Sequence, residues 1–289
     1  SSLEAAVKAL EPGLPFAVIA LGRFGGAELS YASDLDVVFV YEGTDADDFA
    51  EGERVASALL RMLKGATPAN RIYLLDADLR PEGRQGPLAR SIDSYRTYFE
   101  RWAQVWERQA MARARPVAGD VELGRHFLEA VGPLVWGRPL GTEEVREIRR
   151  IKARVERERI PAGEDPQFHL KLGRGSLSDI EFCAQLLQLQ HHLSAPGTME
   201  ALSRLASAGV LDASDATTLA DAYRFCERTR NRLYLLRGAR SDSLPQSSEE
   251  LGRLARSMES TPVELREQYR RVTRRARAVV ERVFYGRVP

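Results

Sequence analysis

Cysteine is scarce in this sequence. Cys183 and Cys226 are the only two cysteines among 289 residues, which excludes the disulfide framework of a small secreted protein. Both lie in apolar patterns of helical spacing, and neither belongs to a metal-binding spacing. We therefore expect two buried free thiols in a protein of the reducing cytoplasm.

Histidine, net charge and long hydrophobic runs are scarce as well. The four histidines show no metal-binding spacing, and a net charge of +1 argues against a chain that wraps nucleic acid. No apolar run reaches the roughly 20 residues that span a membrane, and no signal peptide is recognisable, so we expect no membrane association. The chain starts with Ser1 rather than methionine, and we expect a piece of a longer protein.

The remaining composition is that of an ordinary globular protein. Hydrophobic residues make up 44% and charged residues 29% of the chain, and the length allows two domains with cores of their own. Residues 16–21 and 37–41 are apolar runs typical of buried strands, and residues 45–63 carry apolar side chains at helical spacing. Because everything after about Asp120 is typical of helix, we predict an α+β domain over residues 1–119 and an all-α helical bundle over residues 120–289.

A glycine-rich turn and two carboxylates separate the first two apolar runs. Gly22, Gly25 and Gly26 can adopt backbone angles closed to other residues, and they leave room for a ligand near the main chain. Asp34 and Asp36 lie two residues apart at the start of a strand, so both project to one face. Their repulsion is relieved by a cation or a proton, and Mg²⁺ prefers such oxygen ligands together with phosphates. The pattern predicts metal-assisted nucleotide chemistry, although a plain turn with two solvated acids would have the same letters.

A third acidic position follows in the run RIYLLDADL at residues 71–79. The run predicts a strand in which Asp76 and Asp78 share one face. A carboxylate within such a strand is costly to bury unless it is paired or bound to a metal. We expect one of the two to complete a metal site with Asp34 and Asp36; the alternative is that both mark the solvated end of the strand.

Two loops carry basic residues suited to phosphate. Residues 80–86 are rich in glycine and contain Arg80 and Arg84, which could neutralise phosphates or lie in a solvated turn. The stretch FHLKLGRGS at residues 168–176 places Lys171 and Arg174 in a second glycine loop. We predict a nucleotide site in the cleft between the two domains, with Lys171 and Arg174 facing it from the helical side.

The segment after this loop has the form of a helix start. Ser178 and Glu181 have the spacing of a capping box, with serine at the cap and glutamate three residues later. Acidic residues in a first turn suit the helix dipole. Asp179 and Glu181 are therefore expected to stabilise the helix rather than to act on a ligand.

Three motifs in order resemble one known family. GRFGGAEL at residues 22–29 and SDLDVVFVY at residues 33–41 resemble the polymerase-β-type nucleotidyltransferase motif, in the form found in bacterial glutamine-synthetase adenylyltransferases. The segment DADLRPEGRQG and its continuation to residue 120 resemble the stretch after the metal-binding strand of that family, and KLGRGSLSDIEF at residues 171–182 resembles its second hallmark. Together they cover most of the chain, which is most similar to the C-terminal adenylyltransferase half of the actinobacterial form.

The resemblance implies a fold and a reaction. It implies a polymerase-β-type catalytic domain with a mixed sheet followed by a helical bundle. It further implies ATP as donor, two Mg²⁺ ions as cofactors, release of pyrophosphate, and a tyrosine hydroxyl of glutamine synthetase as acceptor, in the regulation of nitrogen assimilation. A PII-type signal protein could act on the full-length enzyme.

The resemblance also assigns residues. Asp34, Asp36 and Asp76 match the catalytic metal ligands; Asp76 is preferred to Asp78 because the family's third carboxylate lies four residues before the arginine of the R-P pair, here Arg80. Asp78 could instead contact the acceptor or Arg84. The positions implied along the nucleotide are Gly22, Arg23, Gly25, Gly26, Ser33, Arg80, Lys171 and Arg174. Arg23 stands where the family more often has lysine, which keeps the charge but changes its geometry.

Two other functions are compatible with the same motifs. One is nucleotide transfer to an RNA end or a small molecule, against which the near-neutral charge weighs. The other is a non-catalytic half that docks glutamine synthetase or a signal protein, against which the intact acidic triad weighs.

Overall fold

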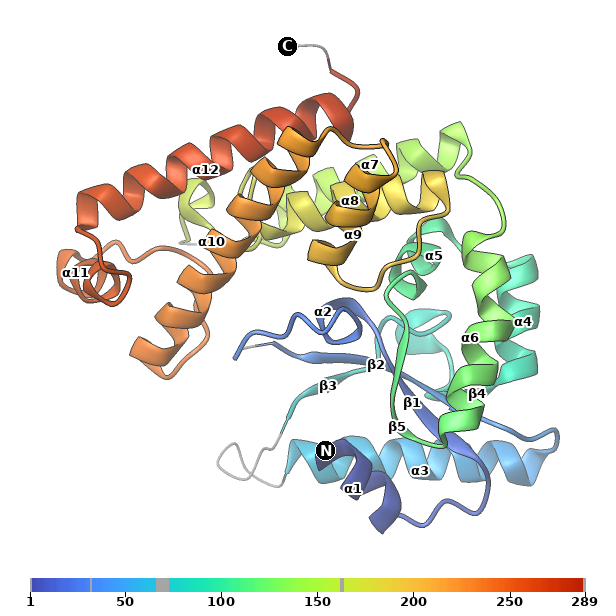
Figure 1. Ribbon diagram of the computed structural model, residues 1–289. Helices are drawn as coiled ribbons and strands as arrows, with labels where there is room; N and C mark the ends of the chain where they lie inside the picture. Colours follow the sequence, from blue (N-terminus) through green and yellow to red (C-terminus); the bar gives the residue numbers. More distant parts are fainter. Residues whose placement is uncertain (1, 32, 66–72, 162–163, 288–289) are drawn as a thin grey trace. The chain divides into compact units, whose positions relative to one another are not determined.

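The computed structural model describes residues 2–31, 33–65, 73–161 and 164–287, and these form two compact units. Unit 1 contains Ser1–Leu29, Ser33–Pro139 and Ser194–Gly197, and unit 2 contains Ser30–Ala32, Leu140–Leu193 and Thr198–Pro289. Unit 1 carries a mixed sheet and unit 2 is helical (Figure 1). The α+β prediction is therefore confirmed.

Unit 1 is built on a five-stranded sheet. Its strands are β1 (Phe16–Ala20), β2 (Leu35–Tyr41), β3 (Leu75–Asp76), β4 (Ala89–Ser91) and β5 (Arg115–Gly119), and the order is β3-β2-β1-β5 with β4 also paired to β2. Strand β1 pairs antiparallel with β2 and β5, whereas β3 and β4 pair parallel to β2. Strands β1 and β2 are central and nearly fully buried, which explains their continuous apolar runs.

Helices cover both faces of this sheet. They are α1 (Ser2–Ala9), α2 (Gly22–Gly25), α3 (Ala46–Lys64), α4 (Ile92–Arg101), α5 (Val105–Met111) and α6 (Val121–Trp136). One face, with Val18 and Phe39, forms a core with side chains of α1 and α3, and both helices lie along this side in Figure 1. Helix α6 packs on β1, β2 and β5 and meets α4, where Phe127 contacts the edge of Tyr95.

The boundary between the units lies later in the chain than the sequence predicted, because helix α6 belongs to unit 1. The sequence predicted the boundary at residue 119, but the structure assigns residues 120–139 to unit 1 as well. The reason is the apolar stripe of α6, in which Leu123, Phe127, Val131 and Val135 are all buried. Helical periodicity shows that such a stripe exists, but it does not show which core the stripe enters.

The predicted strand at residues 71–79 is much shorter in the structure. Residues 71 and 72 lie outside the described part of the chain, and only Leu75 and Asp76 of the remainder belong to a strand. The strand ends there because the Asp76 carboxylate accepts a hydrogen bond from the Asp78 backbone N–H at 2.8 Å, which turns the chain. Asp78 therefore lies in a turn, and the predicted shared strand face for these two acids is wrong.

Unit 2 is a group of packed helices: α7 (Thr142–Glu158), α8 (Leu177–His191), α9 (Thr198–Ser207), α10 (Ala213–Arg237), α11 (Ser248–Ser257) and α12 (Pro262–Val283), with a 3₁₀ turn at Pro166–Phe168. Helices α8 and α12 both pack against α10. Cys183 and Cys226 are fully buried free thiols, as predicted, and burial raises the pKa of both. No helix of the described residues is long and apolar enough to cross a membrane.

Candidate active site

Two of the predicted acids meet at the edge of the sheet in unit 1. Strand β3 pairs parallel to β2 with Asp36 opposite Asp76, and residues opposite each other in a parallel pair share a face of the sheet. Asp36 is half-buried, whereas its neighbours Leu35 and Val37 are buried. Asp34, half-buried, lies just before β2. The structure therefore brings Asp36 and Asp76 together from positions 40 residues apart in the sequence.

The glycine turn is fitted to the Asp36 carboxylate. Gly22 has a φ of +51°, and a Cβ atom at this position would lie 2.2 Å from Asp36 Oδ2. The Leu21 N–H donates a hydrogen bond of 2.8 Å to the Asp36 carbonyl, which joins the end of β1 to the same residue. Gly22 is thus required because the carboxylate occupies the space of its missing side chain.

The other two glycines of the turn are packed against backbone. A Cβ atom at Gly25 would lie 2.0 Å from the Arg113 carbonyl oxygen, and one at Gly26 would lie 2.8 Å from the Pro196 carbonyl oxygen. Their N–H groups donate to the Leu21 and Gly22 carbonyls within the turn. The geometry gives both glycines a packing role, whatever ligand lies nearby.

Two arginines that the sequence analysis did not single out hold this turn. Arg113 donates to the Gly22 carbonyl at 3.2 Å and pairs with Glu28 at 2.7 Å. Arg115 donates to the carbonyls of Phe24 and Gly25 at 2.8 and 2.9 Å. The sequence shows these two arginines in the run RARP at residues 113–116. Their position beside the glycine turn follows only from the pairing of β5 with β1.

The loop after β3 is closed by its own arginines. Arg84 donates to the Asp78 carboxylate at 2.7 Å, so the predicted contact between these two residues is confirmed. Arg80 is buried and donates to the carbonyls of Ala77 and Gly86 at 2.8 and 3.1 Å. These contacts show Arg80 bracing the loop. In the preceding part of unit 1, Arg23 is buried and Ser33 is half-buried.

Lys171 lies in a charged cluster of unit 2. Burial, followed by the nearby Arg230 guanidinium, lowers the pKa of Lys171. Arg230 itself pairs with Asp242 and donates to the Ser30 hydroxyl. Arg174, three residues on, is exposed and pairs with Glu156 at 2.9 Å. The two predicted nucleotide-binding residues of this loop therefore lie in different charge environments.

The turn between these residues is fixed by a buried histidine. His169 Nδ1 accepts hydrogen bonds from the Lys171 and Leu172 N–H groups at 3.2 and 3.0 Å, and its Nε2 lies 3.4 Å from Glu164. Burial lowers the pKa of His169, although the carboxylates of Asp242 and Glu164 oppose the shift. The neutral ring is thus the form that holds the turn.

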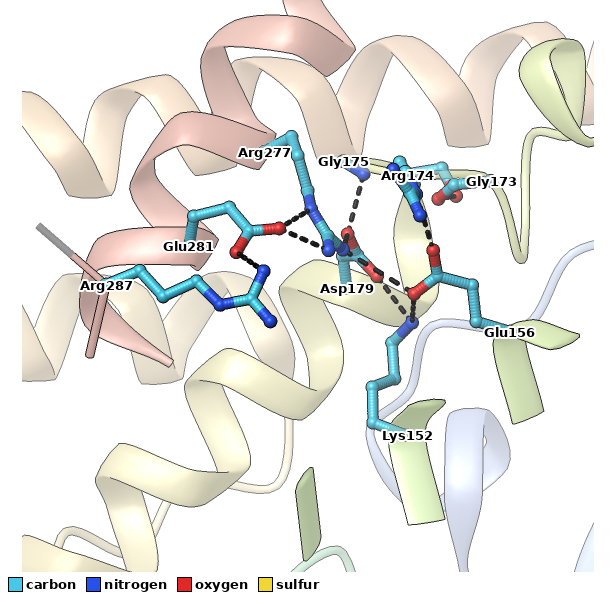
Figure 2. A network of polar contacts seen from close by, with 10 residues as sticks. Lys152, Glu156, Gly173, Arg174, Gly175, Asp179, Arg277, Glu281 and Arg287 are labelled. Atoms are coloured by element: carbon cyan, nitrogen blue, oxygen red, sulfur yellow. Dashed lines mark hydrogen bonds and ion pairs between the residues drawn. The ribbon is translucent and has the colours of Figure 1, made fainter. Parts of the chain in front are cut away.

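The helix start predicted at Ser178 is wrong by two residues. Helix α8 begins at Leu177 with Ser176 as its N-cap, and the Ser176 hydroxyl donates to the Gly173 carbonyl at 2.6 Å. Asp179 does not merely stabilise the helix dipole. Its carboxylate lies 2.5 Å from Lys152 Nζ and 2.8 Å from the Arg277 guanidinium, and it accepts from the Gly175 N–H at 2.7 Å (Figure 2). Asp179 therefore links α7, α8 and α12.

Comparison with known proteins identifies the relationship. Residues 4–130 match the family model of glutamate-ammonia ligase adenylyltransferase, and residues 146–286 match that of GlnD PII-uridylyltransferase. The bifunctional glutamine synthetase adenylyltransferase/adenylyl-removing enzyme of Streptomyces avermitilis is 47% identical over 283 residues, which are 94% of this chain and 28% of the relative. The protein of the same name from Mycobacterium tuberculosis is 45% identical over 280 residues, 93% of this chain and 28% of the relative.

The chain is similar to this adenylyltransferase over most of its own length. It spans about 28% of the length of the curated relatives that it matches. The two matched family models correspond to the two units of the structure. The first match lies in unit 1 except for residues 30–32, and the second lies in unit 2 except for residues 194–197.

The acidic pair of unit 1 suits a hard cation. Within the described ranges, no group of three or more His, Cys, Asp or Glu side chains is close enough to hold a metal ion. Mg²⁺, however, is usually held by one or two carboxylates together with substrate phosphates. Asp36 and Asp76 at one register position provide such a pair, and Asp34 is the nearest further carboxylate along β2.

Proposed function

We propose that this chain transfers AMP from ATP to a tyrosine hydroxyl of glutamine synthetase and releases pyrophosphate. The observation that carries the proposal is the pairing of Asp36 with Asp76, beside a glycine whose missing side chain makes room for the Asp36 carboxylate. The names of the relatives support glutamine synthetase as the acceptor. The match of residues 146–286 to a PII-uridylyltransferase model supports a PII-type signal protein as a partner of the longer protein.

The carboxylates are the centre of the proposed chemistry. Asp34, Asp36 and Asp76 would hold Mg²⁺, with two ions as the full complement, and the metal when bound neutralises phosphate charge and favours the deprotonated acceptor oxygen. In the reaction, the tyrosine oxygen forms a bond to the α-phosphorus of ATP, and the bond from that phosphorus to pyrophosphate breaks. An ordinary tyrosine has a pKa of about 10, so the phenol must lose its proton as the new bond forms.

The rest of the site would position the nucleotide. The glycine turn, braced by Arg113 and Arg115, offers a fixed backbone beside the acids; Arg23 lies within that turn and Ser33 follows it in the sequence. Lys171 is proposed as a further phosphate ligand because KLGRGSLSDIEF at residues 171–182 resembles the second hallmark of the family. Arg80 would act indirectly, through the loop that it braces.

The test is one transfer assay. The chain is incubated with ATP labelled at the α-phosphate, Mg²⁺ and purified glutamine synthetase, and label on the synthetase is measured. We expect transfer by the native chain and none by Asp36→Asn, with the circular dichroism of both proteins unchanged. Label on RNA or a small molecule in place of the synthetase would show a different acceptor. Binding of the synthetase without any labelling would show a docking module and refute the proposal.

A further inference from the structure

Unit 2 contains an open cavity of about 990 Å³ that the proposed reaction does not use. Its walls come from α7, from the glycine loop at residues 172–174, from α12 and from the segment after α12. Small-molecule sites typically have volumes of about 300–1,000 Å³. The cavity is therefore large enough for a metabolite of nucleotide size.

The lining of this cavity is strongly basic. Glu156 is the single acidic residue among the described residues that line it, whereas six arginines do so: Arg157, Arg174, Arg270, Arg274, Arg277 and Arg287. Glu156 is already shared, because its carboxylate lies 2.9 Å from Arg174, 3.5 Å from Lys152 and 3.6 Å from Arg277. Carboxylates outside the lining pair with Arg157, Arg277 and Arg287.

Two of these arginines have no carboxylate partner. Within the described residues, neither Arg270 nor Arg274 forms an ion pair, and both are exposed on α12. Their spacing of four residues places them on one helical face, where like charges repel each other and destabilise the helix. The Arg270 guanidinium is held 5.0 Å from the centre of the Phe168 ring, which restricts its position without neutralising it. An anion between them would relieve this repulsion.

A buried ionic network holds the lining residue Arg277 in place. Lys152 and Asp179 are each 1% exposed, and Asp179 fixes Arg277 and the Gly175 N–H in one network (Figure 2). Gly175 has a φ of +73°, and a Cβ atom there would lie 1.9 Å from the Thr273 carbonyl oxygen on α12. The glycine loop is therefore pressed against α12. Ligand binding would not have to order this framework, which lowers its entropic cost.

We propose that this cavity binds a small molecule that carries two or more phosphate groups. Arginine is suited to this ligand because its planar guanidinium donates two parallel hydrogen bonds to a phosphate. Arg270 and Arg274 supply unneutralised charge at one wall, and Arg277 supplies a guanidinium fixed by Asp179. All of its described lining residues belong to unit 2, whereas Asp36 and Asp76 belong to unit 1.

Titration calorimetry of the full chain with inorganic tripolyphosphate tests the proposal, at about 0.15 M salt to screen surface charge and without divalent cations. We expect saturable binding that the double variant Arg270→Ala/Arg274→Ala weakens by about tenfold or more, because two charged donors are lost. The matched control is Arg271→Ala/Arg275→Ala. It removes the same charge at the same spacing from exposed positions of α12 that are not among the described lining residues, and we expect its affinity to equal that of the native chain.

Several results would overturn the proposal. Equal weakening by both double variants would indicate non-specific attraction to a basic helix. Loss of binding in Lys171→Ala, but not in Arg270→Ala/Arg274→Ala, would place the ligand at the proposed nucleotide site instead. Citrate that binds as tightly as tripolyphosphate would refute the assignment to phosphate. Circular dichroism and the melting temperature of each variant show that the comparison is made between folded proteins.

Discussion

The contact between Gly22 and Asp36 gives a sharp test of the proposed active site. In Gly22→Ala, the new methyl group would lie 2.2 Å from Asp36 Oδ2 and 2.9 Å from its Cγ atom. Ordinary van der Waals contact begins at 3.4 Å, so the oxygen must move by about 1.2 Å. A displacement of about 1 Å in a reacting group can reduce the rate by about 100-fold. We expect transfer to fall by about that factor.

Stability should fall as well. A non-glycine residue at a φ of +51° costs about 1–2 kcal/mol, and the overpacking adds about 1–3 kcal/mol. Gly83 provides a matched control in the same unit, because its φ is +57° and a Cβ atom there would meet only the Asp78 carbonyl oxygen, at 3.7 Å. Gly83→Ala should thus show the same backbone strain of about 1–2 kcal/mol without displacing a carboxylate.

Both variants are compared by urea unfolding and by transfer of labelled AMP at a temperature at which both remain folded. We expect Gly83→Ala to keep most of the native turnover and Gly22→Ala to lose nearly all of it. If the two variants retain equal activity, the position of the Asp36 carboxylate is not important for the reaction. If Gly22→Ala is fully unfolded at that temperature, the overpacking is much larger than the distances indicate, and the magnitude argued here is wrong.

Three further predictions follow from named contacts. Asp76→Asn should abolish transfer, whereas Asp78→Asn should retain measurable turnover because Asp78 lies in a turn. If a kinetic comparison of the two variants gives the opposite ranking, the assignment of Asp76 as the third metal ligand is refuted. Asp179→Asn should destabilise unit 2 by about 3–5 kcal/mol, since it leaves the buried Lys152 ammonium with only the more distant Glu156 carboxylate. Added Lys152→Met should restore part of the loss in urea unfolding, and a loss under about 1 kcal/mol would contradict this reasoning. Because burial lowers the pKa of His169 below its ordinary value of about 6.5, its contribution to stability is complete above that pH and is lost as the pH falls through the folded-state pKa. His169→Gln should make the melting temperature depend less on pH between 7.5 and 5.5, and an unchanged dependence would show that other groups cause it.

The sequence by itself determined the features that depend on neighbouring residues. Apolar runs identified the two central strands, and helical spacing over residues 45–63 predicted α3, which the structure gives as Ala46–Lys64. Asp45 accepts from the N–H groups of Asp47 and Asp48 and so fixes where this helix begins. Apolar surroundings likewise marked Cys183 and Cys226 as buried thiols. Such features follow from local periodicity and capping, which a short stretch of sequence contains.

Only the tertiary structure decided which distant residues meet. Because β3 pairs with β2, Asp76 lies opposite Asp36, whereas Asp78 lies in a turn and accepts a hydrogen bond from Arg84. Local alternation could not make this choice, because the strand ends where the Asp76 side chain bonds to the backbone. Gly22 has its necessary φ because of a carboxylate 14 positions later in the chain.

Long-range charge pairs were equally beyond local reasoning. The spacing around Asp179 suggested an ordinary acid in a first helical turn, whereas the fold buries it between Lys152 on α7 and Arg277 on α12. Helix α6 showed its apolar stripe in the sequence, but packing assigned that stripe to unit 1. Burial of a charge or of an apolar face depends on segments that the whole fold brings together, and no local window of the sequence contains both partners.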